Sequence, residues 1–324
     1  MRIDKNTTIR LGDRNIVKIK IGDSVIWQKT TEPVEGPDYF YIESLGDGNT
    51  ISVVNQRDGS TSGVTPTLEY STDKNTWNTI TFDWAGYGIG TTELPIKLNT
   101  GEKMYFRNDT HLFSNSSSKY ISFSTSVSSN VGGDIRTLSN YLDVNSETTP
   151  QTSMFYYLFY NNKIVDASNL KLPYTTLANS CYRNMFTGCT SLTTAPTLPA
   201  TTLANNCYQY MFYRCNSLTT APELPATTLA SNCYENMFWN CTSLTTAPEL
   251  PANTLASNCY QRMFNGCESL NEITVYANDI SATNCTNRWL SGVASSGTFR
   301  NLGSATYPTD SPSGIPTGWT EVKK

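Results

Sequence analysis

The sequence predicts a multidomain chain, with β-structure in its N-terminal part and an α/β solenoid of 26-residue repeats in its C-terminal part. Three observations predict this. A stretch beginning SLTTAP recurs at steps of 26 residues, from Ser191, Ser217 and Ser243. Short alternating segments, separated by turns rich in Asn, Asp, Gly and Ser, fill residues 39–150. The length of 324 residues is enough for two or three domains.

The first segment, residues 1–29, predicts a small β-hairpin that attaches the chain to something larger. NIVKIKIGDSVIW alternates apolar and polar residues, and Gly22-Asp23 falls where a hairpin would turn. So few residues cannot bury a sufficient core alone, so we expect this segment to dock elsewhere. It resembles the short N-terminal attachment modules of phage tail-associated proteins. The composition of residues 30–38, TTEPVEGPD, predicts a linker.

Residues 39–150 predict an antiparallel β-sandwich. Its expected strands are YFYIES, TISVVN, TLEYST, KMYFRND and YISFSTS, and regular short strands of this kind are typical of sandwiches. Two roles stay open for this domain: a rigid spacer, or a sandwich that binds glycans.

Each repeat predicts one helix followed by one short strand. In the copy at 198–223, apolar residues recur in steps that predict a helical stripe: Leu203, Cys207, Tyr208, Met211, Phe212 and Cys215. The LTTAPEL that follows predicts a strand limited by its proline. Such a unit cannot bury its own apolar face, so stacked copies are expected to form a solenoid over 151–275. Strands about 4.8 Å apart beside helices about 8–10 Å apart predict a curved stack.

The repeats resemble a known family. MFTGCTSLTTAPTLP, MFYRCNSLTTAPELP and MFWNCTSLTTAPELP are similar to the BspA-like (Treponema-type) leucine-rich repeat, in which an aromatic residue and a Cys precede Ser-Leu-Thr. The resemblance covers Leu172 to Val275, with a divergent copy before it from Tyr157. Residues 276–324 are expected to hold a degenerate last repeat and a C-terminal cap. The resemblance implies a leucine-rich-repeat solenoid of the kind found in gut-bacterial surface proteins and their phages.

The nine cysteines form two ladders rather than a disulfide or zinc pattern. Within a copy the spacing is C-x7-C, unlike the short spacing of zinc sites. Two Cys eight residues apart on a helix would lie about 12 Å apart, and a disulfide needs Cα atoms within about 7 Å. We expect buried, free thiols with neither disulfides nor metal. The ladders are Cys181, Cys207, Cys233, Cys259 and Cys285, and Cys189, Cys215, Cys241 and Cys267.

No stretch of the sequence carries a recognisable catalytic or cofactor motif. The one histidine, His111, lies in a polar stretch, and the phosphate-binding glycine motifs and H-E-x-x-H are absent. The net charge of -4 argues against nucleic acid as a partner, and no apolar run is long enough to span a membrane. We therefore expect a protein that is not an enzyme and uses no cofactor.

Four positions of each predicted helix vary between copies, while the apolar positions stay constant. From residue 198 on, these positions carry Tyr, Trp and Arg, which are enriched at binding hot spots, together with Glu235. We expect them to form a binding surface: Tyr210, Tyr213, Arg214, Trp239, Glu235 and Arg262. Two alternatives stay open. The variation is drift on a solvated face, or the binding surface is the strand side, with its constant threonines and Glu223 and Glu249.

These features together predict a phage virion protein, tail-fibre-like or otherwise displayed on the surface, that contacts a bacterial host. Its expected partners are other virion proteins, through residues 1–29, and a host surface glycan or protein. We expect it to be a homo-oligomer or part of a larger assembly. The start, MRIDKNTTIRLGD, shows no apolar core of a signal peptide. The alternatives are a gut-bacterial cell-surface or secreted adhesin, and a purely structural strut.

Overall fold

The computed structural model describes residues 18–21, 24–28, 37–58, 67–81, 87–108, 119–145 and 148–324. The chain divides into two compact units, Met1–Gly36 and Pro37–Lys324. The first unit contains β1 (Lys18–Ile21) and β2 (Ser24–Gln28), which pair antiparallel with Ile21 opposite Ser24. The predicted antiparallel pairing is therefore confirmed. The predicted turn at Gly22-Asp23 lies outside the described residues, and the role of the segment in attachment stays a prediction.

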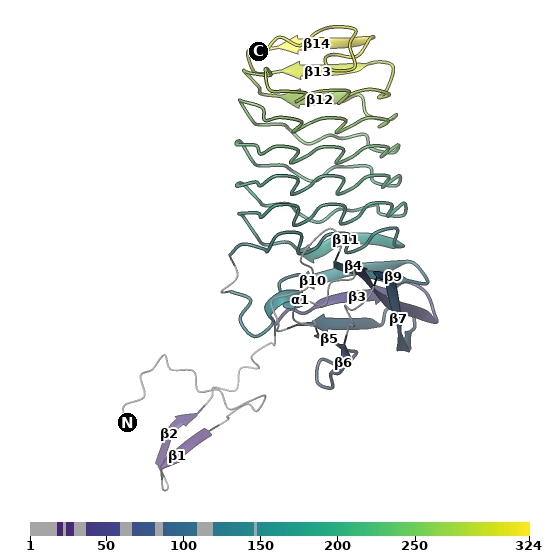
Figure 1. Ribbon diagram of the computed structural model, residues 1–324, viewed down its shortest axis with the longest axis vertical. Helices are drawn as coiled ribbons and strands as arrows, with labels where there is room; N and C mark the ends of the chain where they lie inside the picture. Colours follow the sequence, from purple (N-terminus) through teal and green to yellow (C-terminus); the bar gives the residue numbers. More distant parts are fainter. Residues whose placement is uncertain are drawn as a thin grey trace. The chain divides into compact units, whose positions relative to one another are not determined.

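The second unit begins with two β-sheets (Figure 1). Most neighbouring strands in both sheets pair antiparallel, as the alternating segments predicted. The smaller sheet has the order β7 (Tyr87–Leu98), β4 (Asn49–Asp58) and β9 (Tyr120–Thr125). The larger sheet has the order β11 (Ile164–Lys171), β10 (Ser129–Asp134), β3 (Phe40–Ser44), β8 (Lys103–Arg107), β5 (Thr67–Ser71) and β6 (Asn78–Thr81).

The two sheets share an aromatic core. Phe40 of β3 and Phe106 of β8 point to the side where Phe123 of β9 lies, with ring centroids 5.4 and 4.7 Å from Phe123. All three side chains are buried. Alternate residues of β3 and β8 are buried and half-buried, which is the two-residue period expected of a sheet with one face on a core.

The larger sheet continues directly into the repeats. Its strand β11 pairs parallel with β10 on one side, and on the other side Ala167 donates to the carbonyl of Thr194 in the first repeat. The segment expected to end at residue 150 and the solenoid that follows are thus joined by backbone hydrogen bonds. The short helix α1 (Thr137–Asn140) is the one α-helix among the described residues. No helix in the described part of the chain has the length and apolarity to cross a membrane.

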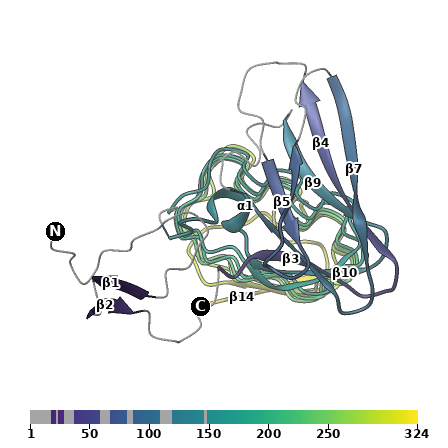
Figure 2. The ribbon, with the colours of Figure 1, turned by 90° about the horizontal axis from the view of Figure 1, so that it is seen from below.

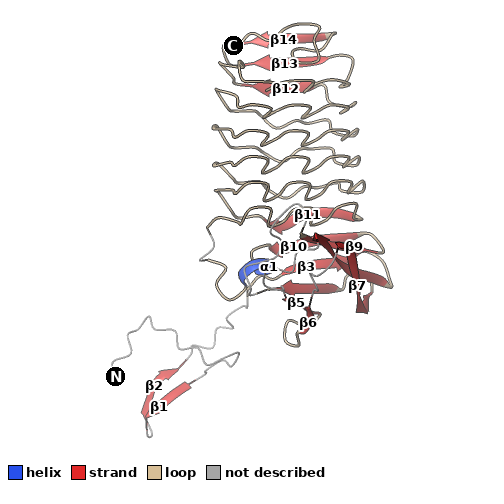
Figure 3. Ribbon diagram, viewed as in Figure 1, coloured by secondary structure: helices blue, strands red, loops and turns tan. Residues whose placement is uncertain are grey.

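The repeats contain no α-helices, so the predicted α/β architecture of the solenoid is wrong (Figure 3). Where helices were expected, each copy forms a chain of overlapping turns, here called a turn ribbon. In the copy at 198–223 the ribbon runs from Ala204 to Cys215. The N–H of Gln209 donates to Asn206 and that of Met211 to Tyr208, each three residues back. The four full copies, 172–197, 198–223, 224–249 and 250–275, are called the first to the fourth.

The intervening N–H groups donate to the next copy instead. Tyr208 donates to the carbonyl of Cys233 and Tyr210 to that of Glu235, at 3.1 and 3.0 Å. Every second N–H along the ribbon therefore closes a turn, and every other one joins two copies. An isolated copy would lose half of these bonds, which explains why the ribbon forms only in a stack.

The apolar spacing of the repeat is four residues, not the 3.6 of an α-helix. A residue with a left-handed backbone, φ between 51° and 75° in the four full copies, precedes each pair of buried residues and also the cysteine that ends each ribbon. Asparagine and glycine adopt this conformation most readily. They occupy eight of the twelve such positions: Asn184, Asn206, Asn232, Asn236, Asn240, Asn258, Gly188 and Gly266. Asn or Gly at every fourth residue was the signal that distinguishes this ribbon from a helix.

The strand side of the first three copies is reduced to isolated bridges. Thr220 bridges Thr246, and a second column joins Thr176, Thr202 and Thr228 and continues to Thr254 of the fourth copy. Each of these copies has two prolines around its threonines, and proline lacks the N–H that would extend a ladder. The fourth copy reads NEITV instead and forms a true strand, β12 (Glu272–Val275).

The copies overlie one another when seen along the stack (Figure 2), and the stack in Figure 1 shows no marked bend. The predicted curvature is therefore wrong. It required helices on one side, whereas hydrogen bonds between backbones join neighbouring copies on both sides. The same side chains meet at every level, as in the ring stack Phe186–Phe212–Phe238–Phe264, with centroids 5.5–5.6 Å apart.

Both ends of the stack are closed by divergent sequence. Before the first copy, residues 151–162 form a turn ribbon without cysteine, whose Phe155 and Phe159 stack on Tyr182 and Phe186. After the fourth, β12 pairs parallel with β13 (Gly297–Asn301), which pairs parallel with β14 (Trp319–Lys323). Here Trp289 is fully buried and stacks on Tyr307 at 5.6 Å.

Candidate functional site

The positions that vary between copies line the outer side of the turn ribbons, called here the variable face. It consists of positions 183, 184, 187 and 188 of the first copy and their equivalents 26 residues apart. In the ribbons, some of these side chains are packed rather than free. Asn236 is fully buried and Gln209 is only 7% exposed. The larger side chains at these positions extend over their neighbours.

The structure brings the six predicted site residues together. The Tyr213 ring lies 5.1 Å from that of Trp239 in the next copy and 5.7 Å from that of Tyr210. The guanidinium of Arg214 lies 5.0 Å from the Tyr213 ring, and that of Arg262 lies 5.7 Å from the Trp239 ring. These residues, with Glu235, are called the aromatic patch. Its rings are tilted and half-buried, so the patch is a surface rather than a pocket.

Glu235 is the acidic group of the patch, and its carboxylate accepts hydrogen bonds from neutral side-chain amides. Gln209 donates to one carboxylate oxygen, and Asn236 donates to the other at 3.0 Å. Burial raises the pKa of Tyr210, the nearby Glu235 carboxylate adds to the increase, and Arg183 and Arg262 oppose it. Both guanidinium groups therefore act on the same tyrosine from different copies.

Three patch residues have a backbone conformation that large side chains avoid. Tyr210, Arg214 and Arg262 have φ of 58°, 60° and 51°. Equivalent positions in sister copies hold Asn184, Asn236 or Asn240. A left-handed conformation costs an ordinary L-residue about 1–2 kcal/mol, and such strain tends to be found at functional sites. The patch therefore carries its large side chains at a cost in stability that asparagine would not incur.

A second group of aromatic residues on the variable face was missed in the sequence. Tyr156, Tyr157 and Tyr160 of the divergent ribbon occupy the positions of Arg183, Asn184 and Thr187. Tyr120 of β9 joins them, with its ring 5.5 and 5.1 Å from Tyr156 and Tyr157. This tyrosine cluster was overlooked because the ribbon lacks cysteine and its register was not aligned with the other copies. Aligning YYLFYNN with the repeat would have revealed it.

The strand side presents the rival surface. Its threonines are exposed at every level: Thr193, Thr194, Thr219, Thr220, Thr245 and Thr246. The hydroxyl of Thr245 donates to the carbonyl of Thr219 at 3.1 Å and that of Thr193 to Val165 at 3.0 Å. Glu223 and Glu249 are exposed beside them, and Tyr276 donates to Glu249 at 3.0 Å. Since the stack is not bent, neither side forms the concave surface typical of other solenoids.

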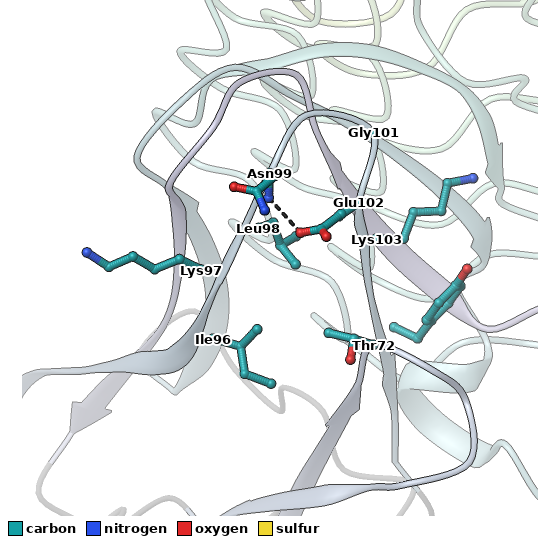
Figure 4. Close-up of a pocket in the computed structure, with 9 residues that line it drawn as sticks. Thr72, Ile96, Lys97, Leu98, Asn99, Gly101, Glu102 and Lys103 are labelled. Carbon is teal, nitrogen blue, oxygen red and sulfur yellow. Dashed lines mark hydrogen bonds between the residues drawn. The ribbon is translucent and has the colours of Figure 1, made fainter.

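The N-terminal sheets contain a depression of about 570 Å³ beside the turn between β7 and β8 (Figure 4). Lys97 and Lys103 point away from each other there. Glu102 accepts the backbone N–H of Asn99 at 2.7 Å. Glu102 is the one carboxylate among the described residues that line the depression. Its hydrogen bond to Asn99 stabilises the turn. The ammonium groups of Lys74 and Lys103 lie 4.5 and 4.2 Å from the rings of Tyr105 and Tyr41.

All nine cysteines are buried, as predicted, and their thiols are free. The separation of about 12 Å on a helix does not support that prediction, because the repeats contain no α-helices. The thiols of one ladder donate to carbonyls of the preceding copy, as Cys241 does to Phe212 at 3.0 Å. Burial raises the pKa of Cys189 and Cys241 to about 12.

His111 lies outside the described residues. Among those that are described, no three potential metal-ligating side chains gather into a group. No protein-family model, curated protein or solved structure matches the chain.

Proposed function

We propose that this chain is a non-enzymatic binding protein, displayed on a phage virion as a tail-fibre-like or other surface protein, that contacts its bacterial host through the variable face. The observation that carries the proposal is the aromatic patch. Tyr, Trp and Arg are the residues enriched at binding hot spots. Here they meet across neighbouring copies, at positions where sister copies carry Asn, Thr or Gly.

The remaining parts of the chain fit this role. The hairpin of residues 18–28 belongs to a separate unit, which suits attachment to other virion proteins. The stack of copies would hold the patch on a rigid support. The resemblance of the repeats to BspA-like leucine-rich repeats supports a setting in gut bacteria and their phages. A bacterial surface adhesin would use the same patch in the same way.

The proposal is tested by replacing aromatic residues with those of sister copies. Tyr213→Thr and Trp239→Asn introduce the residues found at 187 and 265, so the ribbon already tolerates them. The double variant should melt like the parent, within roughly 0.5 kcal/mol. Its binding to host cells or envelope extract should weaken by more than about 1 kcal/mol per residue.

Asn265→Thr is the matched control, because it exchanges two sister residues at the same position without removing a ring. It should bind like the parent. If the double variant also binds like the parent, the variation is drift, and the threonine side becomes the candidate surface. If even the parent chain binds no host material, the structural strut is the better description.

A further inference from the structure

From the arrangement of rings and arginines, we infer that the variable face binds an anionic saccharide chain that runs along the stack and contacts both the tyrosine cluster and the aromatic patch. This inference rests on the proposed function and names the class of its ligand. Its first support is the alignment of the two aromatic groups. Tyr157 and Tyr210 occupy the same position of the ribbon two levels apart, as do Tyr160 and Tyr213.

The first copy lies between the two aromatic groups and carries small side chains next to them. Its residues at the corresponding positions include Thr187 and Gly188, the latter with φ of 75°. A Cβ on Gly188 would meet the side-chain oxygen of Asn161, so a larger residue there would require that side chain to shift. The two aromatic groups are therefore two copies apart along the stack, which is about 10 Å at the spacing of neighbouring strands. Smaller side chains lie between them. An extended ligand could stack on one group and reach the other.

The charge on this face is the second support. Arg183 lies 5.7 Å from the Tyr156 ring and, through its charge, opposes the increase in pKa that burial causes at both Tyr157 and Tyr210. It therefore stands between the two aromatic groups. Arg183, Arg214 and Arg262 form no ion pair with a described residue. With Glu235, these groups carry a net charge of +2 (three cations and one anion), on a chain whose net charge is -4.

Unpaired guanidinium groups recognise carboxylates and phosphates, with which they form paired hydrogen bonds. Aromatic rings offer flat apolar faces, and tyrosine adds a polar hydroxyl. A sugar ring has the complementary features, since its C–H faces are apolar and its rim is polar. An anionic saccharide thus satisfies both the rings and the arginines.

Two other polymers fit less well. An extended peptide commonly binds by adding a strand to a free backbone edge, but the N–H groups along the ribbon are already bonded within or between copies. Nucleic acid needs many cations to replace its counterions, and this face offers only four arginines, Arg183, Arg214, Arg262 and Arg288, on an acidic chain. Recognition here must come from side chains, along a surface of modest positive charge.

The ligand class is tested with envelope polysaccharide purified from the host and presented in three forms. One is untreated, one has its carboxylates reduced to alcohols, and one is dephosphorylated with hydrofluoric acid. We expect the full chain to bind the untreated polymer and to lose at least tenfold in affinity for one of the treated forms. Added salt should also weaken binding. Unchanged affinity for both treated forms would overturn the anionic ligand, and binding of envelope protein alone would overturn the saccharide.

Sister-copy substitutions test the surface. Tyr157→Asn with Tyr160→Thr introduces the residues at 184 and 187, and Arg262→Asn that at 236. Each should weaken binding of the untreated polymer about tenfold without lowering the melting temperature. Arg288→Asn is the matched control. It removes the same charge at the same ribbon position, where φ is also positive, 53°. Among the described residues, the Arg288 guanidinium contacts no aromatic ring.

The outcomes separate this inference from the function it rests on. If Tyr213→Thr with Trp239→Asn abolishes attachment to host cells while the tyrosine variant binds normally, the proposed function stands and the two-cluster site fails. If Arg288→Asn weakens binding as much as Arg262→Asn, the anionic ligand is attracted by the overall charge of the face, and the inferred local contact with Arg262 is wrong. If neither cells nor polysaccharide bind the parent chain, both proposals fail.

Discussion

Individual residues of the ribbon are chosen for backbone conformation as well as for burial. Most of the left-handed positions hold asparagine or glycine, and the exceptions among the full copies are Ser180 and three residues of the aromatic patch, Tyr210, Arg214 and Arg262. None of these three large residues is fully buried, since Arg214 is exposed and Tyr210 and Arg262 are half-buried. The simplest physical explanation is that these large residues lower the stability of the fold but serve its function.

Because Arg214 and Arg262 have left-handed backbones, we expect Arg214→Asn and Arg262→Asn to stabilise the protein. Each should relieve left-handed strain of about 1 kcal/mol or more, against the loss of an exposed cation–π contact of about 0.5–1 kcal/mol. The double variant should therefore unfold at a higher denaturant concentration with an unchanged slope. A lower midpoint would show that the arginines support the fold and would remove the strain argument for a binding role.

The buried thiols should be unreactive in the folded chain. Burial raises the pKa of the Cys189 and Cys241 thiols to about 12 and raises that of the other seven as well. A raised pKa keeps the thiol protonated, and the thiolate is the reactive form. Maleimide at pH 8 should label none of the nine rapidly in native protein and all nine in denaturant. Rapid native labelling of several thiols would mean that the stack opens.

At the scale of elements, the turn ribbon and the α-helix make opposite predictions for one residue. Asn232 has φ of 57° and lies in the ribbon of the third copy. In a helix, alanine would stabilise this position and glycine would cost about 1 kcal/mol relative to alanine. In the ribbon the order reverses, because glycine tolerates positive φ and alanine does not.

Asn232→Ala should therefore destabilise the protein by about 1 kcal/mol, and Asn232→Gly by only a few tenths. Chemical denaturation of both variants measures the difference. The far-ultraviolet circular dichroism of the parent gives an independent check, since it should lack the double minimum of α-helices. A stabilising alanine together with a helical spectrum would contradict the ribbon.

On the scale of the whole second unit, the N-terminal sheets and the repeats share one hydrogen-bonded sheet. Strand β11 pairs with β10, and the Phe159 ring of the divergent ribbon lies 6.0 Å from Phe40 of β3. The sheets thus cover the first end of the stack, as terminal caps do in other solenoids. Removing them would expose a strand edge and aromatic rings.

Truncation should reveal this dependence. Residues 37–324 should fold as they do in the full chain, because they form a separate compact unit. Residues 151–324 should self-associate, because an uncovered strand edge can pair with another chain. Light scattering after size exclusion distinguishes the two. A monomeric 151–324 fragment that melts like the longer chain would show that the sheets contribute nothing to the stack.

The sequence by itself determined the length and register of the repeat, the buried residues and the positions that vary. Identical copies must present the same side chains to one another, so buried and variable positions are visible without coordinates. The hairpin of residues 18–28 and most of the antiparallel strands also followed from alternation and turn residues. The six patch residues were found because their sister copies served as an internal comparison.

Only the tertiary structure decided between helix and turn ribbon. Leu203, Cys207, Met211 and Cys215 lie four residues apart, a spacing that both arrangements satisfy over a short stretch. The choice depends on where alternate N–H groups find acceptors, and for Tyr208 the acceptor is Cys233 in the next copy. The same contacts decided that the stack is not curved and that the tyrosine cluster shares a face with the aromatic patch. Bonds between copies are long-range in sequence, so the apolar spacing alone could not reveal them. The local sign of the ribbon was the Asn or Gly at every fourth residue.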